Sequence, residues 1–390
     1  MNRRITPEGA AFVLRLLYFT HLEENVKIQI TLICAVLLAS LSACGVRSVS
    51  SDAETRIVTD VWGREVRIPA QVQTIVALGS GAPRIAAYLG VVDMMTGSER
   101  MDSENFSVLR DFNPVHHETF SALPVVGRGG GSGDNNAYPE ELIKLAPDVI
   151  IAAFSAEAAD ELFSRTNIPV VSVRYFSINF IDESFYNAMR VFAEVVGAQE
   201  RYQEVMSFIA AHKAELHRRT YGIPDSEKLK VYPGAVTFNG RRGLTGTYSS
   251  FGPLMGINAL NVADEAGMEG FFETNLEQII VWNPDIIFLD PGNMDLVNSE
   301  YAANPAFFNS LRAVQEGRIY TMPAFNFAAT NVTYALMNAY FAGTILFPEQ
   351  FADIDIAEKS AEILTFFLGE NTFDVMASNG LFFGRLSLGE

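Results

Sequence analysis

The stretch from Phe238 to Gly252, FNGRRGLTGTYSSFG, holds the densest group of side chains that could recognise a bound molecule. Arg241 and Arg242 contribute two guanidinium groups, which form paired hydrogen bonds with anions and stack on flat surfaces. Thr247 adds a hydroxyl group and Tyr248 adds an aromatic ring, and rings supply a large contact area. This combination is suited to a large, flat or anionic molecule.

Further candidates follow the segments that we expect to be strands. Open α/β sheets bind ligands beyond the carboxyl ends of their strands, so polar and aromatic residues at these points are candidate contacts. The candidates are Ser80, Arg84, Arg128, Tyr175, Phe176, Phe325, Asn326 and Tyr334. Taken singly, any of these arginines could be an ordinary surface charge, and any of these aromatic residues could belong to the core. Their common position predicts one binding site.

Among these candidates we find no set of residues that indicates catalysis. There is no Ser-His-Asp set, and no pair of carboxylates stands in a recognisable acid–base motif. The glycine-rich segment GRGGGSGD, residues 127–134, fails the dinucleotide pattern because Ser132 replaces its third glycine, and no lysine follows as in a phosphate loop. We interpret the segment as a loop beside the site, and we expect neither a cofactor nor catalytic residues.

Histidine and cysteine usage argues against a protein-ligated metal. His116 and His117 are adjacent and point apart in most conformations, and His212 and His217 lie five residues apart on a predicted helix, mostly on different faces. No histidine follows His217, and the chain after residue 44 contains no cysteine. A metal that is already held by an organic chelator remains compatible with this composition.

The N-terminal region predicts export and lipid attachment. Residues 26–43 combine Lys27 with a mostly apolar run, which is typical of a signal peptide, and they end in small residues before Cys44. The stretch LSAC resembles a bacterial lipobox, in which the cysteine receives a lipid that anchors the protein to the membrane. The alternative is an uncleaved anchor helix with an incidental cysteine. We expect residues 1–25 to be untranslated or disordered.

Periodicity beyond this leader indicates an α/β fold. After a tether, residues 44–55, and a predicted hairpin around Trp62, short apolar runs alternate with helical segments, as expected for parallel strands with crossover helices. Two helical segments interrupt this pattern before it resumes, and the second of them, residues 199–220, has no internal breaker. We therefore assign residues 56–180 to a first lobe, 181–222 to a helical linker and 223–390 to a second lobe.

One phrase occurs in both lobes. YPEELIKLAPDVII, residues 138–151, and NLEQIIVWNPDII, residues 275–287, both place a glutamate, Glu140 or Glu277, seven residues before a Pro-Asp pair and an apolar run. The match predicts two lobes of similar plan. Chance is the alternative, because a helix, a Pro-Asp pair and a strand form a common connection.

The composition excludes one class of partner. The net charge is −18, and no basic stripe interrupts it, so the surface should repel nucleic acid. With 49% hydrophobic and 19% charged residues, the chain has enough apolar material for well-packed cores.

These features together resemble the substrate-binding lipoproteins of ABC importers for iron–siderophores, haem and cobalamin. The lipobox, TDVWGREVRIP, the repeated phrase, the long central helix and NVADEAG carry the resemblance over roughly residues 55–370. It implies two Rossmann-like lobes joined by one long helix, with a ligand cleft between them. It also implies an extracytoplasmic, monomeric protein that captures a metal chelate, first of all a ferric siderophore, with haem, cobalamin or another metal complex as alternatives. A two-lobed enzyme or a surface adhesin would be a competing interpretation.

The same resemblance assigns a role to the repeated glutamates. In such proteins, one exposed glutamate on each lobe docks onto arginines of the permease dimer, and Glu140 and Glu277 match those positions. Separated charges of this kind contribute orientation and association rate more than affinity. The alternative is that each glutamate merely stabilises the first turn of its helix.

Overall fold

The computed structural model describes residues 54–130, 136–175 and 180–389, and residues 54–390 form one compact unit. Cys44, the signal peptide, Phe176 and most of the glycine-rich segment lie outside the described residues. No helix in the described ranges combines the length and the apolar character needed to cross a membrane.

A two-stranded hairpin opens the described chain. Strands β1 (Thr55–Thr59) and β2 (Glu65–Pro69) pair antiparallel around the predicted turn. The Arg56 guanidinium donates hydrogen bonds of 2.8 Å to the carbonyl oxygens of Glu194 and Val195, which fixes the hairpin to the end of a later helix.

The first lobe is built on a parallel sheet with the strand order β5-β4-β3-β6-β7. Its strands are β3 (Ile75–Leu78), β4 (Met95–Glu99), β5 (Val125–Gly127), β6 (Val149–Ala152) and β7 (Val170–Ser172). Its helices are α2 (Ala82–Tyr88), α3 (Arg100–Ser103), α4 (Asn113–Ala122), α5 (Pro139–Leu145) and α6 (Ala156–Thr166), with a 3-10 turn at Val92–Met94. Every residue of β3 and β6 is buried, which explains their unbroken apolar sequences.

Two helices leave the first lobe. Helix α7 (Glu183–Val196) begins at Asp182, whose side chain accepts a hydrogen bond from the Ser184 N–H, and it ends at Gly197 in the left-handed conformation. Helix α8 (Gln199–Thr220) follows with 22 residues and joins the lobes, as the pattern predicted.

The second lobe has the parallel strand order β10-β8-β12-β13 and a separate antiparallel pair, β9 and β11. The strands are β8 (Lys230–Gly234), β9 (Gly246–Ser249), β10 (Leu260–Asn261), β11 (Gly270–Glu273), β12 (Ile286–Leu289) and β13 (Ile319–Thr321). The helices are α9 (Gly252–Gly256), α10 (Leu276–Trp282), α11 (Met294–Ala303), α12 (Pro305–Ser310) and α13 (Arg312–Gln315). Short 3-10 turns lie at Asp225–Glu227, Val262–Ala266 and Pro291–Asn293.

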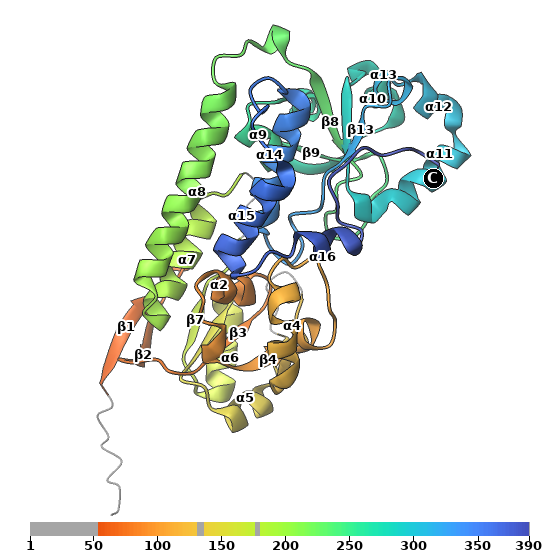
Figure 1. Ribbon diagram of the computed structural model, residues 1–390. Coiled ribbons are helices and arrows are strands. Elements are labelled where there is room, and N and C mark those ends of the chain that lie inside the picture. Colours follow the sequence, from red (N-terminus) through yellow and green to blue (C-terminus); the bar gives the residue numbers. More distant parts are fainter. Residues whose placement is uncertain (1–53, 131–135, 176–179, 390) are drawn as a thin grey trace, which may run out of the picture. The chain divides into compact units, whose positions relative to one another are not determined.

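Three helices end the chain: α14 (Val332–Leu346), α15 (Ile356–Leu368) and α16 (Phe373–Ser378). Helix α14 is buried along nearly its whole length, and it packs against α8, α9 and α15, while α15 also contacts α2 of the first lobe (Figure 1). The final helices therefore contact both lobes, beside the connecting helix α8.

The repeated phrase builds the same joint twice. Helices α5 and α10 both end at a non-glycine residue in the left-handed conformation, Ala146 with φ 49° and Asn283 with φ 42°, and a proline follows each. The chain then enters β6 in the first lobe and β12 in the second, each a strand inside its sheet.

The aspartate of each Pro-Asp pair fastens this joint to the neighbouring strand. The Asp148 carboxylate accepts hydrogen bonds from the Gln73 and Thr74 N–H groups at 2.8 and 2.9 Å, just before β3. The Asp285 carboxylate accepts one from the Lys230 N–H at 2.9 Å, at the start of β8. The repeat thus reflects a common structural plan, because both aspartates satisfy backbone donors at the same point of two similar sheets.

Candidate ligand cleft

A cleft of about 460 Å³ lies between the carboxyl ends of the two sheets. The first lobe contributes Ser80, Met101, Gly130, Ala153, Arg174 and Tyr175, and the second contributes Thr237, Asn239, Gly240 and the segment 326–329. Ser80 follows β3, Met101 follows β4 and Ala153 follows β6, so the lining residues lie where parallel strands present their ends to ligands.

Arg174 gives the cleft its charge. It is the one charged side chain among the described lining residues, and it is half-buried. Within the described ranges it has no hydrogen-bond or ion-pair partner, so its guanidinium group is available to a ligand. An unpaired cation in a concave site favours an anion.

Two buried polar residues support the second-lobe wall. The Thr237 hydroxyl donates a hydrogen bond to the Asp290 carboxylate, and the Asn293 amide donates to the Ala235 carbonyl at 2.7 Å and to the Thr237 hydroxyl at 2.9 Å. Burial raises the pKa of Asp290 to about 6, against the lowering effect of the hydrogen bond from Thr237. These contacts position the loop after β8 at the edge of the cleft.

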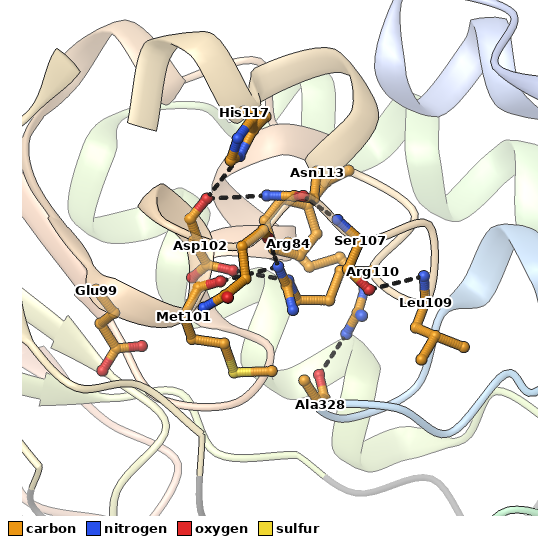
Figure 2. Close-up of polar contacts among 12 residues, drawn as sticks. Arg84, Glu99, Met101, Asp102, Ser107, Leu109, Arg110, Asn113, His117 and Ala328 are labelled. Carbon is orange, nitrogen blue, oxygen red and sulfur yellow. Dashed lines mark hydrogen bonds and ion pairs between the residues drawn. The ribbon is translucent and has the colours of Figure 1, made fainter. Parts of the chain in front are cut away.

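Arg84, on α2 of the first lobe, holds the second-lobe segment 326–329 in place (Figure 2). Its side chain is fully buried, and Nη1 donates to the Ala328 carbonyl oxygen at 2.7 Å, while Nη2 donates to Phe327 O at 3.1 Å and to Asn331 Oδ1 at 2.6 Å. Ala328 and Ala329 have φ values of 49° and 66°, a strained conformation for alanine. The bonds from Arg84 stabilise this conformation in the cleft wall.

Asp111 completes this buried network. Its carboxylate pairs with Arg84 Nε at 2.7 Å and accepts hydrogen bonds from the hydroxyls of Tyr88 and Thr333. Burial, the largest single influence, lowers the pKa of Arg84, but the Asp111 carboxylate and the nearby Tyr175 and Tyr88 hydroxyls together raise it above its ordinary value. Asn331, at the start of α14, also accepts a hydrogen bond from the Asp111 N–H, so the network links both lobes.

Gly81 allows the closest approach in this region. Its φ is 99°, and a Cβ atom at this position would lie 2.6 Å from the Tyr175 ring and 3.0 Å from the Ala329 side chain. A side chain here would therefore clash with the cleft wall on both sides.

The structure places the predicted contact residues in three groups. Ser80, Tyr175 and Asn326 line the cleft. Phe325 is buried and borders a small adjoining pocket beside Asp290. The remaining candidates do not line the cleft: Arg84, Arg128, Arg241, Arg242, Thr247, Tyr248 and Tyr334.

Structural contacts account for most of these displaced candidates. Thr247 and Tyr248 belong to the buried strand β9, and Tyr334 is buried in α14. Arg241 pairs with Asp295, and the Arg242 guanidinium donates to the Phe238 carbonyl and lies over the Phe271 ring. Arg128 is exposed and donates to Asn136 at 3.1 Å.

Sequence reasoning missed Arg174, Thr237, Asn239 and Phe327. Arg174 directly precedes Tyr175 after a predicted strand, so its position alone could have nominated it. Thr237 and Asn239 follow β8 in the same way, but the sequence pattern favoured the nearby Arg241 and Arg242 as contact residues.

Across the described ranges, no three His, Cys, Asp or Glu side chains gather in a way that could hold a metal ion. The polar groups of the cleft are instead hydroxyls, amides and one guanidinium. Such groups recognise the oxygen atoms of an anion or of a metal complex.

Glu140 and Glu277 are not among the residues that line the cleft, and they lie on α5 and α10. Both are exposed and occupy the second position of their helices. Each is followed three residues later by an exposed isoleucine, Ile143 or Ile280, with exposed fractions of 51% and 49%. Residues three apart are neighbours on a helix surface, so each lobe presents one carboxylate beside one large apolar side chain.

Known proteins are similar to this chain in sequence and in architecture. A family model described as periplasmic binding protein matches residues 75–324. The molybdate-binding protein MolA of Haemophilus influenzae is 25% identical over 350 residues, which cover 82% of this chain and 93% of that protein.

Solved structures agree with the fold. The structure of MolA with molybdate superposes with a TM-score of 0.60 at 20% identity, covering 81% of this chain and 98% of that one. A periplasmic solute-binding protein from Veillonella parvula gives a TM-score of 0.63 at 19% identity, covering 84% and 97%.

Proposed function

The chain belongs to the periplasmic binding protein family, whose members bind small ligands for ABC transporters, and on this premise we propose that its cleft captures a metal chelate for an importer. A ferric siderophore is the first candidate, and haem, cobalamin or another metal complex are alternatives. The protein then acts by binding and delivery and needs no catalytic residue or cofactor of its own.

Arg174 carries this proposal. A guanidinium group that has no partner among the described residues, in a water-accessible cleft, offers an anionic ligand a charged partner. Tyr175 and Phe327 add aromatic surface, and Thr237, Asn239 and Asn326 add polar groups. Clefts of 300–1,000 Å³ typically hold small organic ligands, so a volume of about 460 Å³ suits a chelate.

Molybdate is the second candidate ligand. The similarity to MolA, which extends over 93% of that protein, favours an oxyanion. Arg174 and the hydroxyl and amide groups would serve an oxyanion as well as a chelate. The size of the cleft favours the larger ligand.

We also propose that Glu140 and Glu277 dock on the permease dimer. Their exposure, their equivalent helix positions and the exposed isoleucine beside each support a surface that meets two equivalent sites. We propose in addition that the protein is an extracytoplasmic monomer, held at the membrane by a lipid on Cys44. Mass spectrometry of the protein from its host would detect that lipid.

The ligand class is tested by calorimetric titration of the purified protein. The panel contains a ferric catecholate siderophore, a ferric hydroxamate siderophore, haem, cobalamin and sodium molybdate, with sodium sulfate as a control anion. Saturable binding of a ferric siderophore with a Kd of about 1 μM or below supports the first candidate, and such binding of haem or cobalamin selects that alternative. Tight binding of molybdate alone selects the second, and a panel without any binding rejects both.

A further inference from the structure

Glu99 is a buried carboxyl group at the edge of the cleft that the proposed function does not yet use. It is the last residue of β4, and its exposed fraction is 2%. It borders a water-sized pocket together with Ser80, Met101 and Ala328, all of which also line the ligand cleft. The pocket is therefore an extension of the cleft into the first lobe.

One oxygen of this carboxyl group is satisfied and the other is not. Oε2 accepts a hydrogen bond of 2.9 Å from the Gly79 N–H. Oε1 is buried and has no hydrogen-bond partner within the described part of the chain. A buried polar atom without a partner is rare in folded proteins and calls for an explanation.

The neighbouring charges do not neutralise Glu99. Arg110 Nε lies 3.0 Å from Asp102 Oδ1 and forms an ion pair with it, although the two atoms do not have hydrogen-bond geometry. Arg84 forms its ion pair with Asp111. His117, on α4, faces the carbonyl oxygen of Asp102 at 3.1 Å. In Figure 2, no dashed line joins Glu99 to Asp102 or Arg110.

A buried carboxylate without a cation is unfavourable, so the neutral acid is the preferred form. Burial raises the pKa of Glu99 to about 8, and the negative charge of Asp102 adds to this effect, whereas the hydrogen bond from Gly79 opposes it. At neutral pH the group can therefore offer an O–H donor at the Oε1 position.

We propose that Glu99 contacts the ligand and helps to determine its specificity, by donating a hydrogen bond from its neutral carboxyl group to an acceptor atom of the anion. This inference rests on the proposed function. It gives the first lobe a donor at the end of β4, while Arg174 supplies the positive charge after β7. A ligand without an acceptor atom in the extension would leave this donor unpaired and would bind less tightly.

Two variants test the inference with the tightest-binding member of the panel. Glu99→Gln keeps the shape and an acceptor for Gly79, and its NH₂ group replaces the O–H donor. Glu99→Leu has a similar size but no polar atom. Glu104→Gln makes the same substitution at an exposed residue outside the pocket and is the matched control. Thermal unfolding of each variant checks that it is folded.

We expect Glu99→Leu to weaken binding about 10- to 100-fold at pH 6.5, as for loss of a hydrogen bond to a charged group. Glu99→Gln should stay within about threefold of the unmodified protein at that pH. Between pH 7 and pH 9 the unmodified protein should lose about tenfold more affinity than Glu99→Gln, because ionised Glu99 repels the anion. Glu104→Gln should match the unmodified protein throughout.

Two results would overturn the inference while leaving the proposed function intact. In one, the ligand binds but Glu99→Leu retains full affinity. In the other, affinity rises with pH and Glu99→Gln weakens it at pH 9, which means that the carboxylate holds a cation. If no member of the panel bound the unmodified protein, both the proposed function and the inference would be rejected.

Discussion

Arg84 Nε lies 2.7 Å from Asp111 Oδ1, and solvent reaches neither side chain. Both residues belong to the first lobe, yet the same guanidinium group also binds the second-lobe segment that walls the cleft. This ion pair therefore has a structural role and a role in shaping the site.

We predict that Arg84→Met lowers the free energy of unfolding by about 3–5 kcal/mol, because it leaves the Asp111 carboxylate buried without its partner. Chemical denaturation measures this change. Arg100→Met, which removes an exposed ion pair with Glu104, is the control and should lower it by less than about 1 kcal/mol. Equal effects of the two variants would contradict the prediction.

We predict that Arg174→Gln weakens ligand binding about 10- to 100-fold, because the cleft then lacks its positive charge. Calorimetry with the ligand identified from the panel measures the loss. Arg218→Gln, at an exposed position on α8, removes the same charge and should leave the affinity unchanged. A loss that is equal for both variants would indicate a nonspecific effect of net charge.

We predict that Glu140→Ala combined with Glu277→Ala impairs uptake through the permease and leaves the ligand Kd unchanged. The reason is that both carboxylates are exposed on α5 and α10. Uptake of radiolabelled ligand into cells or proteoliposomes is the measurement. Glu141→Ala combined with Glu265→Ala, two other exposed glutamates, should leave uptake unaffected. If the Glu140→Ala and Glu277→Ala protein instead bound its ligand less tightly, these glutamates would belong to the ligand site and not to a docking surface.

We predict that Glu99 makes the ligand-free protein more stable in acid than in base. The pKa of Glu99 is raised from its ordinary value of 4.5 to about 8 in the folded protein. The stabilising contribution of Glu99 to the free energy of unfolding is therefore complete below pH 4.5 and is lost as the pH rises through 8. Between pH 5 and pH 9 the Tm of the unmodified protein should therefore fall more than that of Glu99→Gln. Parallel pH profiles of the two proteins would contradict this prediction.

Long local patterns predicted the scaffold well. Helix α8 has the bounds 199–220 because an uninterrupted helical period follows Gly197, which ends α7. The repeated Pro-Asp phrase correctly indicated two similar joints, because a left-handed helix end, a proline and an aspartate lie within a few residues of one another in both copies.

The site was harder to predict, because its side chains depend on distant partners. Arg84 follows a strand, as a ligand-binding arginine would, but it meets Asp111 and Asn331, which lie far along the chain. Tyr248 has the composition of a contact residue, but β9 buries it. Local sequence does not reveal such pairings, and the same holds for Glu99, whose importance comes from an oxygen atom that nothing in the described chain satisfies.

The double connection between the lobes has a kinetic and calorimetric consequence. Helix α8 joins them on one side, and the Arg84–Asp111–Asn331 network joins them at the cleft. A cleft that is already assembled loses little conformational freedom when a ligand enters, so association need not wait for a large rotation of one lobe. Differences in affinity between ligands should then arise from their dissociation rates, and the heat-capacity change on binding should reflect the ligand's own buried surface.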